Sequence, residues 1–195
     1  SVKIIFQNKS DQKFFLKEII KKKSAVIPGS GVNTNYYKYS KPPKTICFLM
    51  ISRIIKNKGI INYFKLSKIL SKKYPNIKFL FVGKEQKNFS LNINLDKGYL
   101  KKHNIQFIDW KNDVRSIFDK CSVYVLPSKR EGFSRSILEA MSSGKPIITT
   151  NVPGCKEAVI NNFNGYLVGY NDLNGLIKSA EKFIKRPSII KKLGI

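Results

Sequence analysis

The feature that most constrains this chain is a series of short apolar runs, each followed by a segment with helical character. Residues 79–82 read Phe-Leu-Phe-Val, and residues 122–126 and 146–150 are similar stretches of strand length. Strands that are apolar along their whole length are typical of parallel sheets covered by helices on both faces. Alternating strands and helices form βαβ units with right-handed crossovers. The chain is therefore expected to adopt an α/β fold with a Rossmann-like parallel sheet flanked by helices.

The same patterns assign the individual elements. Strands are expected at residues 2–6, 25–28, 46–52, 77–82, 105–108, 122–126, 146–150 and 166–168. Helices are expected at residues 12–22, 59–73, 95–102, 114–120, 134–143, 155–160 and 171–185. In the helix at 59–73, the side chains of Ile61, Phe64 and Leu70 are expected to face the core. Pro42 and Pro43 fit neither a helix interior nor a central strand, so residues 39–44 are read as a linker.

The charge of the chain is extreme. It has 37 Lys and Arg residues against 12 Asp and Glu residues, a formal net charge of +25. Such a charge favours an anionic partner, which could be nucleic acid, an acidic membrane surface or a phosphorylated substrate. Biased composition is the competing interpretation, because the lysines are scattered over most segments. The 42% of hydrophobic residues is enough for a packed core, and no apolar run approaches the ~20 residues that cross a bilayer.

The cysteines and the histidine argue against a metal centre. Cys47, Cys121 and Cys155 are odd in number and lack metal-ligand spacing. They are expected to be small buried residues in a reducing compartment. The expected location is therefore the cytoplasm, where the protein could also bind peripherally to the inner face of the membrane. His103 is the single histidine, which excludes a histidine-rich metal site.

A pair of carboxylates marks the segment with the most chemistry. Glu131 and Glu139 lie between the strands expected at 122–126 and 146–150, at the sheet edge where open α/β sheets bind ligands. A carboxylate can accept two hydrogen bonds from vicinal hydroxyl groups of a sugar or ribose. Ser134 can cap the helix that carries Glu139, and a helix start favours an anion. Taken alone, however, Glu139 reads as an exposed helix glutamate or as one partner of a salt bridge, because it lies off the apolar stripe of the helix.

A basic turn follows the strand at 46–52. Arg53 can bind two phosphate oxygens at once, and Lys58 can act as a mobile point charge. In so basic a chain, this turn by itself is equally consistent with a solvated surface.

The ordered set of landmarks is more specific than any one of them. Residues 125–154 resemble the C-terminal half of retaining glycosyltransferases of family 4, which have the GT-B fold. Further matches fall in the same order at residues 27–33, 48–53 with Lys58 and Gly59, 81–83, 154–157 and 164–168. The resemblance covers nearly the whole chain. Its nearest type is the bacterial enzymes that extend lipid-linked oligosaccharides or polysaccharides.

The resemblance implies transfer of a hexose or N-acetylhexosamine from a UDP-sugar, with retention, to a glycan or a polyprenyl-diphosphate-linked acceptor. It implies no metal and no cofactor besides the donor substrate. Arg53 and Lys58 would bind the diphosphate, Glu131 the donor sugar and Glu139 the ribose. The other implied donor-binding residues are Gly132, Phe133 and Ser134, through their backbones, and Trp110 and Lys111, beside the base.

The sequence departs from the family pattern at three positions. Ser134 stands where many relatives have proline, and Asn33 stands where an aspartate is usual. Asp109 stands where relatives often have glycine, and a carboxylate there puts the base contact of Trp110 and Lys111 in doubt.

The resemblance also implies a domain organisation. Residues 1–38 would be the tail of an N-terminal acceptor domain with the interdomain loop, residues 39–44 the linker, and residues 45–195 the nucleotide-sugar-binding domain. The chain would then be a fragment without most of the acceptor site. Alone, it is expected to bind donor nucleotide weakly and to transfer no sugar.

Two alternatives remain. A non-enzymatic nucleic-acid-binding protein would use the net charge, although the aromatic residues lie mostly inside apolar runs and no nucleic-acid motif is found. A nucleotide-sugar epimerase on the same fold is the second. Hydrolases also use two carboxylates, but the basic turn favours a phosphate leaving group.

Overall fold

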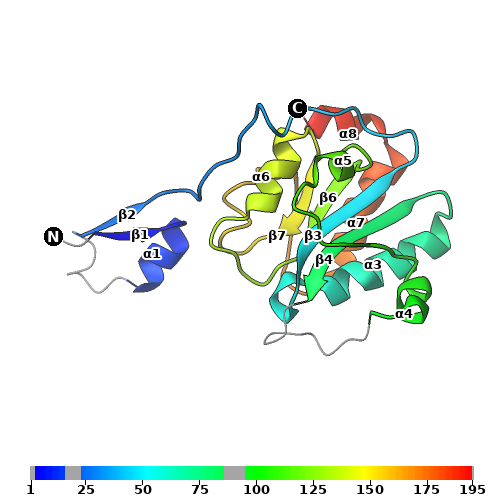
Figure 1. Cartoon of the computed structure of the whole chain (residues 1–195), viewed down its shortest axis with the longest axis horizontal. Helices are drawn as coiled ribbons and strands as arrows, with labels where there is room; N and C mark the ends of the chain where they lie inside the picture. Colours follow the sequence, from blue (N-terminus) through cyan, green and yellow to red (C-terminus); the bar gives the residue numbers. More distant parts are fainter. Residues whose placement is uncertain (1–2, 16–22, 86–94, 195) are drawn as a thin grey trace.

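The computed structural model describes residues 3–15, 23–85 and 95–194, which form two parts joined by an extended segment (Figure 1). The first part is a small unit of β1 (Ile4–Phe6), α1 (Lys9–Phe15) and β2 (Ser24–Val26). Its two strands pair in parallel. The segment after β2 then runs to the larger part, which contains the rest of the chain.

The larger part is built on a parallel sheet of six strands in the order β5-β4-β3-β6-β7-β8. This confirms the expected α/β class and the parallel sheet. The strands are β3 (Cys47–Ile54), β4 (Lys78–Glu85), β5 (Gln106–Asp109), β6 (Val123–Leu126), β7 (Ile147–Thr150) and β8 (Gly165–Val168).

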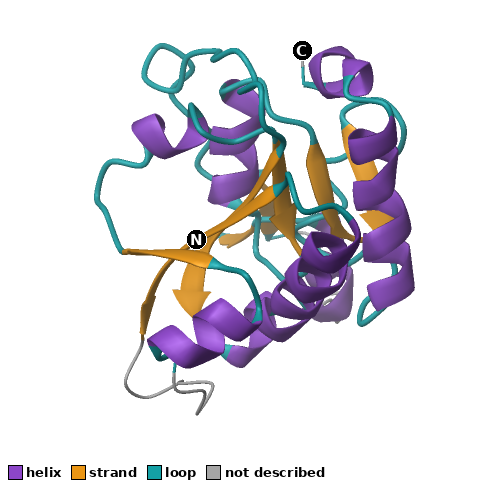
Figure 2. Cartoon of the chain, turned by 90° about the vertical axis from the view of Figure 1, so that its right-hand side faces the viewer, coloured by secondary structure: helices purple, strands orange, loops and turns teal. Residues whose placement is uncertain are grey.

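Helices cover both faces of this sheet (Figure 2). Helix α6 packs on β6 and β7, and α7 packs on β7, β8 and α3. The helical elements are η1 (Lys56–Lys58), α3 (Ile60–Lys73), α4 (Lys97–Lys102), α5 (Arg115–Phe118), α6 (Arg135–Ser142), α7 (Leu173–Lys185) and α8 (Ser188–Leu193). In the part of the chain that the structure describes, no helix combines the length and the apolar character needed to cross a bilayer.

The core lies between the sheet and its helices. All three cysteines are buried in it, as expected. The hydroxyl group of Tyr63 in α3 donates to the carbonyl oxygens of Phe48 and Leu80 at 2.9 and 2.8 Å, which fixes this helix across β3 and β4. The expectation for Ile61 was wrong, because Ile60 takes the core-facing position in the first turn of α3 and Ile61 is 40% exposed.

Three helix assignments differ from expectation. The helix expected at 155–160 is a series of turns, in which the Cys155 N–H donates to Val152 and the Ala158 N–H donates to Cys155. Helix α8, after Pro187, was not expected from the sequence. The first helix begins at Lys9 rather than at residue 12; residues 16–22 of the expected helix lie outside the described part.

The sheet reverses its strand order between β3 and β6. These two strands pair only through Phe48 with Val123 and Leu49 with Tyr124, so the carboxyl half of β3 runs on beside β4 alone. The hydroxyl group of Tyr124 donates to the Ile51 carbonyl oxygen at 3.0 Å where the strands diverge. In doubly wound sheets, such a switch point leaves a crevice at the carboxyl edge that serves for ligand binding.

The segment that joins the two parts is tied down beside α6. The buried ammonium group of Lys145 donates to the Ser40 carbonyl oxygen at 2.6 Å, and the Ser40 N–H donates to Ser143 at 3.2 Å. The hydroxyl group of Ser142 donates to the Tyr37 carbonyl oxygen. Burial lowers the pKa of Lys145. These bonds bring Tyr37 against α6, far along the sequence from its neighbours.

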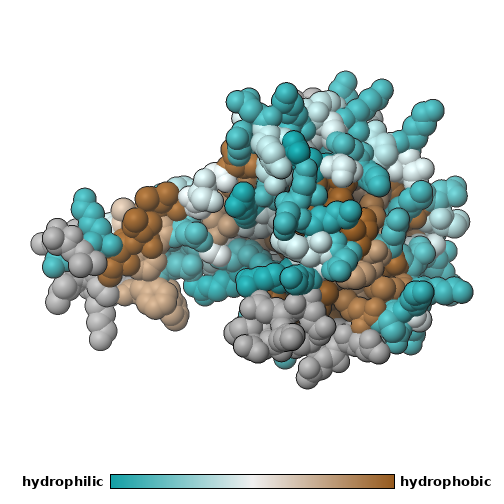
Figure 3. Space-filling view, in the orientation of Figure 1, coloured by the Kyte–Doolittle hydropathy of each residue, from teal (hydrophilic) through white to brown (hydrophobic). Residues whose placement is uncertain are grey.

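The surface of the small unit is unusually apolar (Figure 3). Ile5, Phe14 and Phe15 are 60%, 75% and 58% exposed. Two strands and one helix cannot bury their own apolar side chains, so this unit presents a surface of the kind that other protein elements usually cover.

Candidate functional site

A cavity of about 460 Å³ opens at the carboxyl edge of the sheet, at the switch point between β3 and β6. It is lined by all the predicted site residues except Gly132. The lining residues are Tyr37, Ile51, Ser52, Arg53, Lys58, Trp110, Lys111, Asn112, Val114, Glu131, Phe133, Ser134, Arg135, Ser136 and Glu139. The structure therefore brings together residues from the segment that joins the two parts, from β3, from the segments after β3, β5 and β6, and from α6.

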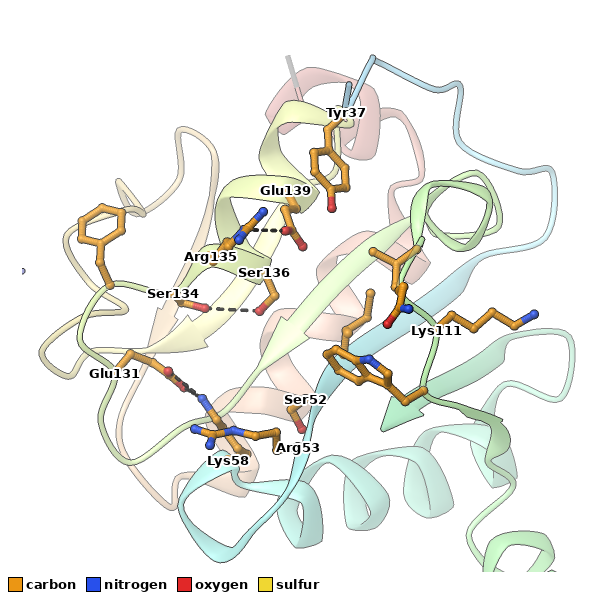
Figure 4. A pocket seen from close by; sticks show the side chains of 15 residues that line it. Tyr37, Ser52, Arg53, Lys58, Lys111, Glu131, Ser134, Arg135, Ser136 and Glu139 are labelled. Atoms are coloured by element: carbon orange, nitrogen blue, oxygen red, sulfur yellow. Dashed lines mark hydrogen bonds and ion pairs between the residues drawn. The ribbon is translucent and has the colours of Figure 1, made fainter. Parts of the chain in front are cut away.

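Lys58 and Glu131 form the strongest polar contact of the cavity. The Lys58 ammonium group lies 2.6 Å from each carboxylate oxygen of Glu131, and Ser128 Oγ donates to Glu131 Oε1 at 2.6 Å. The two charged side chains are only 16% and 11% exposed. Two residues to which the sequence assigns different parts of a ligand are therefore paired with each other in this structure (Figure 4).

The loop after β6 is anchored to η1 and to β7, which explains how Glu131 reaches Lys58. The Lys129 N–H donates to the Asn57 carbonyl oxygen in η1 at 2.8 Å. Thr149 and Thr150 in β7 donate through their hydroxyl groups to the carbonyl oxygens of Leu126 and Ser128. The cation of one turn and the carboxylate of the other are thereby held face to face.

Gly59 and Gly154 allow two neighbouring segments to approach the loop after β6 closely. Gly59 has φ of 72°, and a Cβ atom there would lie 2.0 Å from the Pro127 carbonyl oxygen. Gly154 has φ of 81°, and a Cβ atom there would lie 2.1 Å from the Glu131 carbonyl oxygen. Because a side chain would be strained at positive φ and would also clash, both positions require glycine.

The start of α6 differs from expectation. Ser134 occupies the cap position, but its side chain makes no capping bond; its Oγ lies 3.3 Å from Ser136 Oγ instead. Its N–H donates to the Gly154 carbonyl oxygen at 3.1 Å, so this backbone group is engaged within the protein. At the start of α6, Ser134 and Ser136 line the cavity together with Arg135.

Glu139 is buried, with 8% of its surface exposed, so the interpretation as an exposed helix glutamate was wrong, whereas the alternative of a salt bridge is confirmed by its ion pair with Arg135. The burial has a tertiary cause, because Tyr37, from the segment that joins the two parts, lies over this turn of α6 and points its hydroxyl group toward the carboxylate (Figure 4). Arg135 Nε donates to Glu139 Oε1 at 3.1 Å. Burial raises the pKa of Glu139 above its ordinary value, and burial next to this carboxylate raises the pKa of Tyr37 to about 12.

Trp110 and Lys111 follow β5 on the opposite side of the cavity from α6. Trp110 is 43% exposed, and Lys111 extends its ammonium group away from the cavity centre (Figure 4). The carboxylate of Asp109, which puts the base contact in doubt, accepts a hydrogen bond from the Trp110 N–H at 2.7 Å. Asp109 is therefore engaged with the backbone beside it.

Sequence reasoning missed several lining residues, above all Tyr37 and Arg135. Tyr37 belongs to a segment about a hundred positions before α6, so no local pattern connects it with Glu139. Arg135 lies one turn before Glu139 on the same helix, and the spacing of four residues between opposite charges was the signal that could have found it.

The cavity is suited to an anion that also carries hydroxyl groups. Its cationic side chains outnumber its carboxylates by four to two: Arg53, Lys58, Lys111 and Arg135 against Glu131 and Glu139. In residues 3–15, 23–85 and 95–194, no group of three or more His, Cys, Asp or Glu side chains is placed to hold a metal ion. The predicted independence of metals and cofactors stays a prediction.

Solved structures of other proteins show the same fold. The chain superimposes over its whole length on 57% of the Anabaena protein HepE in complex with UDP, with a TM-score of 0.82 and 19% identity. It also matches 93% of a C-terminal domain of a glycosyl transferase group 1 family protein from Francisella tularensis, with 84% of this chain covered, a TM-score of 0.72 and 22% identity. The fold is that of the C-terminal domain of GT-B glycosyltransferases, as expected.

Sequence relatives point the same way. An uncharacterized glycosyltransferase of Haemophilus influenzae is 34% identical over 75% of this chain and 41% of its own length. The Escherichia coli UDP-Gal:alpha-D-GlcNAc-diphosphoundecaprenol alpha-1,3-galactosyltransferase is 31% identical over 68% of this chain and 35% of its own length. A Campylobacter jejuni N,N'-diacetylbacillosaminyl-diphospho-undecaprenol alpha-1,3-N-acetylgalactosaminyltransferase is 28% identical over 83% and 45%.

The chain thus spans less than half the length of these relatives. Residues 33–194, most of the chain, match the family described as glycosyl transferases group 1. The chain belongs to the glycosyl transferases group 1 family.

Proposed function

We propose that the cavity at the switch point binds a UDP-sugar, and that the chain is the donor-binding half of a glycosyltransferase. The observation that carries this proposal is the placement of two cations, Arg53 and Lys58, and a buried carboxylate, Glu139, around one cavity of a doubly wound sheet. Such sheets bind nucleotides at this position. A diphosphate needs cations, and the vicinal hydroxyl groups of a ribose need a hydrogen-bond acceptor such as a carboxylate.

Arg53 and Lys58 bind the diphosphate in this proposal, and Glu139 accepts hydrogen bonds from the ribose hydroxyl groups. Trp110 borders the base together with Lys111. When the bond to the sugar breaks, negative charge grows on the departing diphosphate, and cations that are already in place stabilise it. Neither a metal ion nor a cofactor is required. The transfer of a hexose or N-acetylhexosamine with retention is part of the proposal and is supported by the family resemblance.

Glu131 binds the donor sugar in this proposal. Both of its oxygens are held by Lys58 in the structure. A phosphate group beside Lys58 would draw the ammonium group toward itself. One oxygen of Glu131 would then accept a hydrogen bond from the sugar, while Ser128 and Lys58 keep the other. Phe133 would border the donor through its backbone, and Ser134 through its hydroxyl group.

The acceptor site belongs, in this proposal, to an N-terminal domain of which residues 1–38 are the tail. Residues 39–44 would be the linker and residues 45–195 the nucleotide-sugar-binding domain. The exposed apolar side chains of the small unit support this division, because a larger domain would cover them. The acceptor would be a glycan, polyprenyl-diphosphate-linked as in the names of the Escherichia coli and Campylobacter jejuni relatives. An enzyme using such an acceptor would work in the cytoplasm, against the anionic inner face of the membrane. The chain alone would bind donor and transfer nothing.

The test is a calorimetric titration of the chain with UDP, UDP-N-acetylgalactosamine and UDP-glucose at about 150 mM salt, where exposed charges are screened beyond ~8 Å. Glu139→Ala should abolish most of the binding. Asp119→Ala is the matched control, because Asp119 is an exposed carboxylate outside the cavity. Duplex DNA is the rival ligand.

Binding of uridine nucleotides that Glu139→Ala removes and Asp119→Ala leaves intact would support the proposal, and the ranking of the sugars would begin to identify the donor. A chain that binds DNA tightly in a salt-dependent way, but no uridine nucleotide at millimolar concentration, would overturn it.

A further inference from the structure

The small N-terminal unit touches the loop that carries Glu131, although the two lie far apart in the sequence. Asn8, between β1 and α1, is only 2% exposed. Its amide nitrogen donates to the Gly132 carbonyl oxygen at 2.7 Å, across 124 residues of chain, and to Asp11 Oδ2 at 2.9 Å. Its amide oxygen accepts from the Asp11 N–H at 2.7 Å. A buried asparagine with its amide groups engaged in this way is held in one orientation.

An ion pair adds a second contact beside the first. Arg130, two residues before Gly132, pairs with the carboxylate of Asp11. Its guanidinium group also lies 5.7 Å from the ring centre of Phe14 in α1. Asp11 is thus shared between Asn8 and Arg130, so the start of α1 binds the loop both before and after Glu131.

A third contact, made by the small unit with the loop, explains why position 132 is a glycine. A Cβ atom on Gly132 would lie 2.0 Å from the amide oxygen of Gln7. A Cβ atom on Gly29, in the segment after β2, would meet the Phe133 side chain at 3.1 Å. Gly132 does not line the cavity. Its lack of a side chain therefore serves the approach of the small unit to the loop.

We propose that this contact, made by Asn8 and Asp11 with Arg130 and Gly132, positions the loop that carries Glu131 for the donor sugar. The inference rests on the proposed function, because it assigns the N-terminal unit a part in the same site. Asn8 and Asp11 are positioning residues: they touch the loop and not the cavity. Recognition of the sugar thereby depends on docking of the N-terminal unit, whereas recognition of UDP, on the Arg53 and Glu139 side, does not.

The test exploits this difference between UDP and UDP-sugar. Asp11→Arg and Arg130→Asp each place like charges at the contact, and the double variant restores opposite charges in exchanged positions. Affinities of UDP and of the UDP-sugar that binds wild type best are measured for each variant by calorimetry. Lys13→Ala is the matched control, because Lys13 is an exposed residue in the last turn of α1.

Each single variant should weaken UDP-sugar binding by about fivefold or more, the size of one lost hydrogen bond or ion pair, and leave UDP binding within about twofold. The double variant should recover most of the lost affinity. An unchanged ratio of the two affinities in both single variants would overturn the inference, as would a double variant that recovers nothing.

Hydrogen exchange keeps the inference testable without a ligand. The amides of residues 131–133 should exchange faster in Asp11→Arg and in the milder Asn8→Asp, and at the wild-type rate in the charge-exchanged double variant. Equal exchange rates in all variants would contradict the contact. If wild type binds neither UDP nor any UDP-sugar, the proposed function fails, and these exchange rates still decide whether the N-terminal unit holds the loop.

Discussion

The ammonium group of Lys58 lies 2.6 Å from both carboxylate oxygens of Glu131, and both side chains are mostly buried at the mouth of the cavity. The two residues come from turns that follow different strands, β3 and β6, so their pairing closes the carboxyl edge of the sheet at its switch point. Each partner compensates the buried charge of the other, so the pair stabilises the site in addition to its proposed role in donor binding.

Replacing Lys58 by methionine should therefore cost stability as well as binding. Glu131 would keep a mostly buried charge and would lose the ammonium group that contacts both of its oxygens. We expect the free energy of unfolding to fall by about 2 kcal/mol, measured by urea denaturation, and UDP binding to weaken. Lys56→Met is the control, since Lys56 is exposed in the same turn; an equal loss in both variants would contradict a specific role for the pair.

Glu139 should make both stability and nucleotide binding depend on pH. Burial raises its pKa, so the folded protein favours the protonated form. Its stabilising contribution is then fully present below the unfolded pKa of about 4.3 and is lost as the pH rises through the higher folded value. Glu139→Gln removes this dependence, so the stability of the variant relative to wild type should increase with pH across this window. Denaturant unfolding at a series of pH values measures it.

Nucleotide binding should show the opposite trend in the same window. The ionised carboxylate can accept two hydrogen bonds from the ribose, whereas the protonated form has lost part of that capacity. The affinity of wild type for UDP should therefore fall on acidification, beginning above the pH at which an ordinary glutamate is protonated. A flat calorimetric profile between about pH 4 and pH 7 would argue against a ribose contact of Glu139.

Tyr37→Phe should shift that profile. The Tyr37 hydroxyl group lowers the pKa of Glu139 by hydrogen bonding, against the larger opposing effect of burial. Without it, the pKa of Glu139 should rise further, and the loss of UDP affinity should begin at a higher pH. Tyr39→Phe is a matched control two residues away, where the ring is 52% exposed. Identical profiles for the two variants would show that Tyr37 does not act on the site.

Gly154→Ala should distort the loop that carries Glu131. A Cβ atom there combines positive φ with an approach of 2.1 Å to the Glu131 carbonyl oxygen. Gly31→Ala separates the two effects, since Gly31 has φ of 71° and no atom within 4 Å of the added Cβ. The control should lose about 1 kcal/mol from backbone strain alone. Gly154→Ala should lose clearly more, together with UDP-sugar binding; equal losses by urea denaturation would leave no role for the clash.

Much of the fold could be predicted from the sequence, because strands buried on both faces are continuous apolar runs and helices of a parallel sheet fall between them. Residues 79–82 and 122–126 are of this kind, and both form central strands. Prediction failed where the local signal was short or ambiguous. The segment at 155–160 has helical spacing but bends through turns, and α8 was missed behind Pro187.

The sequence alone also indicated that residues following different strands gather at one site, since the carboxyl ends of parallel strands lie at one edge of the sheet, but it did not indicate Tyr37 or Arg135. It did not determine how those residues face one another. Three contacts join segments that are remote along the chain: the pairing of Lys58 with Glu131, the burial of Glu139 beneath Tyr37 and the hydrogen bond from Asn8 to Gly132. Such contacts arise from packing in three dimensions, which places side chains together irrespective of their spacing, and only the tertiary structure could decide them.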